Sequence, residues 1–428
     1  MTGAPDAPPS LESWVKDLAE SHDVRGSLVC RDSCHGRGLF AGTAVTRGDV
    51  VLSVPKRLVL YIQSSAGLSL PPDGSWPRVR AGVAADAPAA GKTWELILAR
   101  AVVDAVAGDG GEFWAAYSGL MPPPETLAHP FLLDDEVMDE LQDEALAEEG
   151  RREAARVAAL LPDLADPLEP GGPSVGAWAL ALVRSRAMLA GSGGTYAVVP
   201  FLDLANHATA PTIDYRCDGV ETRESSGIKA QAVEDADRFE LVGLADVAPG
   251  KEVHLAYTKG NLTSAEHFAQ YGFAPAGGSP MDRIDLRTDG GDAKAATRLK
   301  AAVRGLLKEA LVTRGGSAPD WVAAAASVSA VLCGPDSKAG DMMTLEEEVG
   351  LLDALQTRVK DLEASWRTSL EEDEAALAAI EGARGSGEGD DDGNRERMGN
   401  ILGLRLNKKR LARRIGEVLE GCRLQVYS

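Results

Sequence analysis

The sequence is poor in aromatic residues, which make up 5% of its 428 residues. Its five cysteines are too few and too scattered for a disulfide framework. They are Cys30, Cys34, Cys217, Cys333 and Cys422. Cys30 and Cys34 lie beside His35, but no second close pair of ligand residues accompanies them. We therefore expect no metal site, because a structural zinc needs four ligands.

Long hydrophobic runs are also missing, and none reaches the length of a transmembrane helix. Basic residues are outnumbered, with 44 Lys and Arg against 65 Asp and Glu and a net charge of -21. A protein that binds nucleic acid needs clustered Lys and Arg to face the phosphates. We therefore expect neither nucleic acid nor a membrane as a partner, whereas a basic protein substrate stays compatible with this charge.

The N-terminal residues Met1 to Asp23 are acidic and contain no Arg. This composition is the opposite of a transit peptide, and the segment lacks the apolar core of a signal peptide. We expect a cytoplasmic or nuclear protein, or a chloroplast stroma protein whose transit segment is absent from this chain.

The length allows two or three domains, and the pattern of residues divides the chain into β-rich and helical stretches. A capped helix is predicted at Ser10–Ser21. Strands are predicted at 27–30, 38–41, 49–54, 195–201, 238–244 and 252–257. Helices between the two β-rich parts are predicted at 93–106, 112–120, 134–161 and 174–189. This helical block fits an insertion within one domain better than a separate domain.

Helices dominate the rest of the chain. One short helix is predicted at 263–270, with Thr263 or Ser264 as its cap. Longer helices are predicted at 292–312, 319–332, 344–380 and 394–420, and residues 381–393 are predicted to be a solvated acidic linker.

Four short segments carry residues that hydrophobic periodicity does not explain. They are Gly36–Ala41, Pro200–His207, Glu252–Tyr257 and Tyr271–Phe273. Each has an ordinary structural interpretation, since an Asn after a strand commonly bonds its own backbone. Gly36 and Gly38 would let the backbone approach a ligand closely.

In this order the four segments resemble a SET domain, the fold of many protein lysine methyltransferases. The intervening Arg184-Ser185-Arg186 narrows the resemblance to the Rubisco large-subunit methyltransferase-like family. The resemblance implies an α+β fold, with a SET-domain β-fold that carries a helical insertion, followed by an all-α C-terminal domain. The implied division is a helical lead at 1–24, a SET domain at 25–280 with its insertion at about 85–185, and a substrate-binding domain at 281–428.

The resemblance also implies a site for S-adenosyl-L-methionine. Main-chain groups of the first loop contact this methyl donor, Arg186 meets its carboxylate, and Asn206 and His207 hold its amino-acid end and adenine. The implied cofactor-binding residues are Gly36, Arg37, Gly38, Leu39, Arg186, Asp203, Asn206, His207 and Tyr271. Arg186 could instead be an ordinary helix-end residue that pairs with Asp203.

Tyr257 is the implied catalytic residue, and it would act by position and electrostatics rather than as a nucleophile. Its hydroxyl and nearby carbonyls can accept weak C–H···O bonds from an electron-poor methyl group. Met188, Tyr257 and Tyr271 are the implied substrate-binding residues. An apolar residue such as Met188 favours lysine over histidine as the target.

The leading interpretation is a monomeric protein-lysine N-methyltransferase that acts on Rubisco large subunit or on another plastid or cytosolic protein. Two alternatives stay open: protein-histidine methylation, and a non-catalytic interaction protein that keeps the SET scaffold. A basic cluster near the C-terminus could bind the protein substrate or form a solvated helix face. Its members are Lys408, Lys409, Arg410, Arg413 and Arg414.

Overall fold

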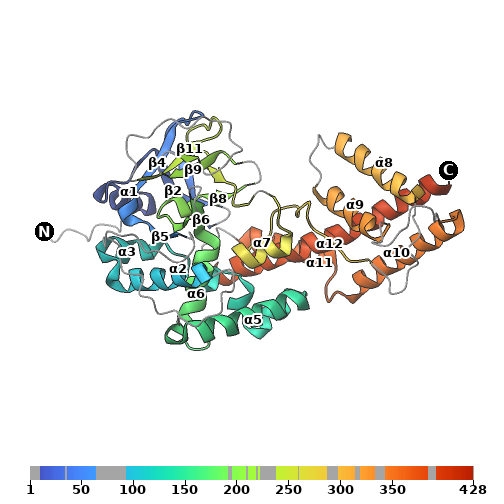
Figure 1. The fold of residues 1–428 in the computed structure, drawn as a ribbon, viewed down its shortest axis with the longest axis horizontal. Helices are drawn as coiled ribbons and strands as arrows, with labels where there is room; N and C mark the ends of the chain where they lie inside the picture. Colours follow the sequence, from blue (N-terminus) through green and yellow to red (C-terminus); the bar gives the residue numbers. More distant parts are fainter. Residues whose placement is uncertain are drawn as a thin grey trace. The chain divides into compact units, whose positions relative to one another are not determined.

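A computed structural model describes residues 10–33, 36–63, 93–190, 195–208, 211–217, 220–221, 238–258, 260–286, 297–313, 319–332, 343–383 and 392–427. By their internal contacts, Met1–Pro122 and Ala155–Lys259 form one compact unit, and Pro123–Ala154 and Gly260–Ser428 form a second (Figure 1). The division predicted from the sequence, at 1–24, 25–280 and 281–428, stays a prediction. Cys34, His35 and the segments 71–90 and 191–194 lie outside the described residues.

The described residues of the first unit form four small sheets with the strand orders β1-β4-β11-β9-β10, β2-β3, β5-β7-β6 and β12-β8. The first six strands are β1 (Arg25–Gly26), β2 (Leu28–Ser33), β3 (Gly36–Ala41), β4 (Val50–Pro55), β5 (Leu60–Gln63) and β6 (Ala187–Ala190). The others are β7 (Thr195–Val198), β8 (Asn206–His207), β9 (Ile213–Cys217), β10 (Val220–Glu221), β11 (Arg238–Gly243) and β12 (His254–Leu255). The predicted strand at 252–257 is thus wrong in extent, since only His254 and Leu255 form a strand.

The largest sheet is buried on both faces at its centre. In β4 the residues from Val51 to Pro55 are all buried, and β11 is buried throughout, Arg238 and Glu240 included. The buried guanidinium of Arg238 donates to a carboxylate oxygen of Asp23 at 3.0 Å and to the carbonyl of Ser53 at 2.9 Å. A buried cation is tolerated when it is paired and hydrogen-bonded in this way.

Helices of the first unit are α1 (Leu11–Ser21), α2 (Thr93–Asp104), α3 (Gly111–Tyr117) and α6 (Val175–Arg186), with a π-helical turn at Ala105–Asp109. The predicted cap of α1 is confirmed, because the Ser10 hydroxyl accepts from the amide of Ser13 at 3.2 Å. Helices α2 and α6 lie side by side (Figure 1), and Arg184 donates to the fully buried carboxylate of Glu95 at 3.1 Å.

The prediction that one helix runs from 174 to 189 is wrong at its end. Helix α6 stops at Arg186, and the backbone of Ala187 is extended. The next residues, Ala187–Ala190, pair with β7 in an antiparallel ladder. These four residues continue the apolar pattern of the helix in sequence. Their backbone pairs with β7 instead of continuing α6, so they form a strand.

The predicted long helix at 134–161 is also wrong. It is broken into α4 (Asp135–Asp139) and α5 (Glu144–Leu160), the latter spanning the boundary between the two units. Gln142 lies between them with a φ of 50°, which a helix does not allow. The carboxylate of Asp143 then accepts from the amide of Leu146 at 3.2 Å and caps the new helix.

The second unit is helical. Besides α4 it contains α7 (Ser264–Tyr271), α8 (Thr297–Thr313), α9 (Pro319–Leu332), α10 (Leu345–Ser365), α11 (Leu370–Ala383) and α12 (Asp392–Tyr427). The long α12 runs beside α8, α9, α10 and α11 (Figure 1). Its residues Leu411, Ile415, Val418 and Leu419 enter a core that also holds Leu352 and Leu355 of α10.

The helix ends of this unit test two sequence predictions, the cap of α7 and the single helix at 344–380. Thr263 is the cap of α7 and forms a complete capping box with Glu266, which confirms the first option. The single helix predicted at 344–380 is wrong, because α10 ends at Ser365 and α11 begins at Leu370. A capping box begins α11: the amide of Glu372 donates to the Ser369 hydroxyl at 3.1 Å, and the Ser369 amide donates to Oε2 of Glu372 at 2.7 Å.

The basic cluster of α12 is paired with acidic groups of its own unit. Lys408 pairs with Asp143, Lys409 with Asp373, Arg410 with Glu374, Arg413 with Glu371, and Arg414 with Asp320 and Glu417. At the centre, Asp373 is 1% exposed and binds both Lys409, at 2.6 Å, and the buried Arg405. The pairs of Lys409, Arg410 and Arg413 therefore hold α11 and α12 together.

Among the described residues no helix is long and apolar enough to cross a membrane. The same residues contain no group of three or more His, Cys, Asp or Glu that could hold a metal ion.

Replacing Asp373 should destabilise the second unit strongly. In Asp373→Ala the buried cations Lys409 and Arg405 lose their shared carboxylate, and breaking a buried ion pair in this way costs about 3–5 kcal/mol. Urea denaturation followed by circular dichroism measures the free energy of unfolding. The control is Glu374→Ala, whose partner Arg410 is exposed, with an expected loss of about 0.5 kcal/mol. Equal losses in the two variants would contradict the assignment.

Candidate active site

The candidate site is framed by β3, β8 and the stretch that leads into β12, all in the first unit. Strand β3 pairs with β2, and its other edge meets 251–253, where the amide of Val253 donates to the Leu39 carbonyl at 2.8 Å. The chain then continues into β12, which pairs in parallel with β8 and so sets His254 opposite Asn206. This pairing brings three of the predicted segments, 36–41, 200–207 and 252–257, to one place.

Asn206 connects two of these segments through its side chain. The amide nitrogen Nδ2 donates to the carbonyl of Arg37 at 3.1 Å and to Oε1 of Glu252 at 2.7 Å. Gly38 lies against both groups, since a Cβ there would stand 2.3 Å from Glu252 Oε1 and 2.9 Å from Asn206 Nδ2. No side chain fits in that space, so position 38 requires glycine for close approach.

His207 and Tyr257 lie next to each other. The backbone amide of Tyr257 donates to Nδ1 of His207 at 3.1 Å, and the two ring centroids are 5.2 Å apart. The Tyr257 hydroxyl donates to the carbonyl of Ala205 at 2.8 Å. The hydroxyl proton is therefore committed to the backbone, which leaves the Tyr257 oxygen as an acceptor.

Arg186 and Asp203 form a buried pair. Asp203 follows the strained Phe201 in the short turn Leu202–Leu204, and its side chain is 2% exposed. Nε of Arg186 lies 3.7 Å from Asp203 Oδ2, which is too long for a hydrogen bond. That nitrogen is buried and has no hydrogen-bond partner among the described residues. A guanidinium with an unused buried donor is suited to receive a carboxylate.

Tyr117, the last residue of α3, joins the helical part to this pair. Its hydroxyl donates to the Asp203 carboxylate and accepts from the amide of Phe201 at 2.8 Å. Phe201 has a φ of 67°, which is rare for a bulky residue. The rings of Tyr117 and Phe201 pack edge to face with centroids 5.2 Å apart.

Burial controls the titration of these groups. Desolvation raises the pKa of Asp203, while Arg186 and the hydrogen bond from Tyr117 lower it. Desolvation and the neighbouring Asp203 charge raise the pKa of Tyr117 well above its ordinary value. Burial also raises the pKa of the Cys30 thiol to about 11, so this cysteine is not a reactive thiolate.

The remaining predicted site residues are placed as follows. Gly36, Arg37 and Leu39 lie in β3, and the Arg37 side chain donates to the Gly119 carbonyl at 3.3 Å, so only its backbone faces Asn206. Met188 lies in β6 opposite Ala197 and is 8% exposed. Tyr271 ends α7 in the second unit, where its ring centroid is 4.7 Å from that of His267.

Two residues at the site were missed by the sequence reasoning. Glu252 belonged to a recognised segment, but alternation along a strand gives no reason to link it to Asn206, 46 residues away. Tyr117 lies in a helix that was predicted only from its apolar pattern, and its polar contact with Asp203 spans 86 residues. A Tyr on the buried face of a helix is a usable signal, because a buried hydroxyl needs a partner.

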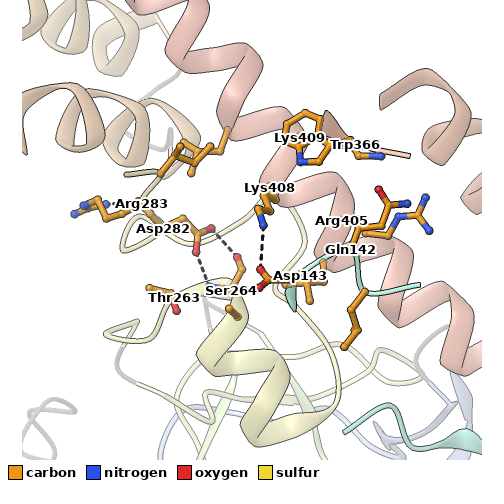
Figure 2. A pocket seen from close by; sticks show the side chains of 15 residues that line it. Gln142, Asp143, Thr263, Ser264, Asp282, Arg283, Trp366, Arg405, Lys408 and Lys409 are labelled. Carbon is orange, nitrogen blue, oxygen red and sulfur yellow. Dashed lines mark hydrogen bonds and ion pairs between the residues drawn. The ribbon is translucent and has the colours of Figure 1, made fainter. Parts of the chain in front are cut away.

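The second unit contains a cavity of about 180 Å³ (Figure 2). Trp366, Leu404 and Leu411 supply apolar surface, and Figure 2 shows Lys408 directed at Asp143 and Asp282 at Ser264. Asp282 accepts from the Ser264 hydroxyl at 2.6 Å, and Lys408 donates to Asp143 at 3.0 Å. These polar groups already have partners within the unit, so they hold the cavity walls.

Tyr117→Phe should destabilise the protein in a pH-dependent way. It removes the hydroxyl that accepts from the buried amide of Phe201 and donates to Asp203, for a loss of about 1–3 kcal/mol. The lost bond favoured the charged carboxylate, so the pKa of Asp203 rises further. Stability falls as the pH rises through a raised carboxyl pKa, and the loss should therefore be larger at about pH 8 than at about pH 5.

Urea denaturation of parent and variant at the two pH values measures this difference. The matched control is Tyr257→Phe, whose hydroxyl donates to a carbonyl rather than to a carboxylate. Its loss should be the same at both pH values. A pH-independent loss in Tyr117→Phe would separate Tyr117 from Asp203.

No protein-family model and no curated protein matches this sequence. Solved structures do match it. The chain is similar to the SET domain of LSMT bound to lysine and AdoHcy, with 18% identity, a TM-score of 0.54, and coverage of 98% of this chain and 93% of that chain. It is similar to Rubisco LSMT bound to sinefungin and monomethyllysine, with 16% identity, a TM-score of 0.54 and coverage of 98% and 93%.

A third similar structure, the SET domain of LSMT bound to MeLysine and AdoHcy, has 18% identity, a TM-score of 0.55 and coverage of 98% of this chain and 94% of that chain. At such identities the likeness concerns the fold. The α+β fold class predicted from the sequence is confirmed: the chain has the fold of the LSMT SET-domain structures, with a helical C-terminal part.

Proposed function

We propose that this chain is an S-adenosyl-L-methionine-dependent protein-lysine N-methyltransferase. The observation that carries the proposal is the arrangement of Gly38, Asn206 and Arg186 in a chain with this fold. The similar structures are described as bound to AdoMet, AdoHcy, sinefungin, lysine and methylated lysine. Those ligands suggest the cofactor and the substrate class to test here.

The described residues fit the methyl donor at its amino-acid end. The unused buried Nε of Arg186 can donate to a carboxylate, and Asn206 Oδ1 is available as an acceptor because Nδ2 has both of its hydrogen bonds. The close packing at Gly38 lets a main chain approach a ligand without obstruction. Gly36, Arg37, Leu39, Asp203 and His207 complete the proposed cofactor-binding set within the first unit.

When bound, the donor supplies a methyl group on a positively charged sulfur. Tyr257 would act at the reacting centre. Its hydroxyl proton is held by Ala205, so its oxygen can accept weak C–H···O bonds from that methyl group and help to align the attacking amine. Tyr257 is therefore the proposed catalytic residue.

A target lysine must lose its proton before it can attack. A free lysine has a pKa of about 10.4, so only about one in a thousand is neutral at about pH 7.4. An apolar lining disfavours the ammonium and lowers that pKa. Met188, which is nearly buried, is proposed to supply part of the lining, and Tyr271 stays a proposed substrate-binding residue.

Substrate recognition is proposed for the helical residues 281–428, and chemistry for the SET domain at 25–280 with its insertion at about 85–185. Rubisco large subunit is the first substrate to test, with other plastid and cytosolic proteins next, and a chloroplast location stays part of this proposal. We propose a monomer that binds neither nucleic acid nor membrane, in keeping with the net charge of -21.

The basic cluster of α12 is a poor choice for probing recognition. Lys409 is 2% exposed and binds the buried Asp373, so reversing its charge would break a buried ion pair. A loss of substrate binding in such a variant would reflect damage to the helical unit.

The purified protein should bind S-adenosyl-L-methionine and transfer its methyl group to a protein lysine without added metal. Calorimetry measures the binding of donor and S-adenosylhomocysteine. Incubation with labelled donor and a plastid or cell extract, followed by mass spectrometry, identifies the labelled residue. A chain that shows no saturable binding at millimolar donor would overturn the proposal, and methylated histidine would replace lysine as the target.

Tyr257→Phe should lower kcat by roughly 10- to 100-fold and change the Kd for S-adenosylhomocysteine by less than about threefold. The hydroxyl is proposed to act only at the reacting centre, and such a group affects kcat rather than ligand affinity. The matched control is Tyr196→Phe, whose ring stacks on Trp94 at 3.7 Å in the same unit and which should keep parent activity. Full activity in Tyr257→Phe would remove the residue from the reaction.

A further inference from the structure

We propose that Glu252 is a positioning residue of the donor site. It holds the Asn206 carboxamide in one orientation and makes this end of the site selective for a protonated amine. The inference rests on the proposed function and deepens it. Glu252 was not among the predicted site residues, and it is assigned to recognition of the amino group of the methyl donor.

The orientation of the Asn206 amide follows from its partners. A carboxamide has one donor end and one acceptor end, and the two are nearly the same in shape. Both neighbours of the Asn206 side chain, the Arg37 carbonyl and Glu252 Oε1, are acceptors, at 3.1 and 2.7 Å. Reversing the amide would bring its oxygen against both. The nitrogen therefore stays inward, and Oδ1 is left for a ligand.

Glu252 is itself held in place. Its second oxygen, Oε2, accepts from the Ser33 hydroxyl at 3.0 Å and lies 3.6 Å from Nε2 of His254. Its backbone bridges to Phe40 on the edge of β3, and its side chain is 14% exposed. Side chains locked by packing and hydrogen bonds position a site more accurately than mobile ones.

Gly38 shows how closely the carboxylate approaches the loop. A Cβ at position 38 would stand 2.3 Å from Glu252 Oε1 and 3.1 Å from its carboxyl carbon. The space a side chain would need at position 38 is taken by the Glu252 carboxylate and the Asn206 amide. Gly38 thus serves the placement of Glu252 as well as the approach of the main chain to a ligand.

The chemistry of this end of the site selects its ligand group. The available atom of Asn206 is an acceptor, and the carboxylate of Glu252 lies against the same amide. A group that donates hydrogen bonds and carries positive charge satisfies both, and a hydrogen bond to a charged group is stronger than a neutral one. The ammonium of an amino-acid moiety fits, whereas a carboxylate or a neutral hydroxyl gains less.

The test compares two ligands that differ in this moiety. S-adenosylhomocysteine has the amino-acid end, and 5′-methylthioadenosine lacks it. Glu252→Ala should weaken S-adenosylhomocysteine about 30-fold and 5′-methylthioadenosine less than about threefold, by calorimetry. Glu252→Gln keeps the size of the side chain and its oxygen can still accept from Asn206, while its amide nitrogen replaces the acceptor of the Ser33 hydroxyl. The charge is lost but Asn206 stays oriented, so the affinity loss should be about three- to tenfold.

Two controls separate positioning from general damage. Asp246→Ala removes an exposed carboxylate from the same unit and should change neither affinity. The double variant Asn206→Ala with Glu252→Ala should lose little more than Asn206→Ala alone, because coupled residues are not additive. Thermal unfolding of each variant reports whether it is folded.

The outcomes separate this inference from the proposed function. If the parent binds neither ligand, the proposed function fails and the role of Glu252 falls with it. If the parent binds both, and Glu252→Ala loses both equally or neither, the function stands and the positioning role is wrong. Additive losses in the double variant would likewise show that Glu252 does not act through Asn206.

Discussion

The first unit depends on one crowded point, where the Asn206 carboxamide, the Glu252 carboxylate and the backbone at Gly38 meet. The carboxamide nitrogen joins Arg37 and Glu252, which are 169 and 46 positions away. Because both hydrogens of that nitrogen are used, strands β3, β8 and the segment before β12 have a fixed relation to one another. The site is therefore built by the same contacts that close this part of the fold, and a change at any of the three positions alters both.

Buried charges in the two units have different consequences. In the first unit Arg186 and Asp203 stand 3.7 Å apart and leave a guanidinium nitrogen unused, so the pair keeps binding capacity. In the second unit Asp373 is saturated by Lys409 and Arg405. A saturated pair contributes specificity of packing and has nothing left for a ligand. Charge counting along the sequence cannot make this distinction, because it depends on which partner each side chain meets.

The sequence predicted elements well where local chemistry decides them. The cap of α1 at Ser10, a cap of α7 at Thr263 or Ser264, and α9 at Pro319–Leu332 were predicted from residues inside or next to each helix. It failed where a distant partner wins, as at Ala187–Ala190, which pairs with β7. The same holds for the site. Motif residues such as Asn206 were proposed by resemblance, whereas the contacts of Glu252 with Asn206 and of Tyr117 with Asp203 span 46 and 86 residues.

Helix α3 has a direct physical connection to the site. A bulky residue with positive φ costs on the order of 1–3 kcal/mol, so Phe201 needs compensation. Tyr117 provides it by accepting the Phe201 amide and packing against its ring. The same hydroxyl donates to Asp203, two residues later in the turn that leads into β8. Because one side chain holds both the strained residue and the buried carboxylate, the position of α3 and the geometry before Asn206 are coupled. Tyr117 thus connects α3 to the shape of the turn that leads to Asn206.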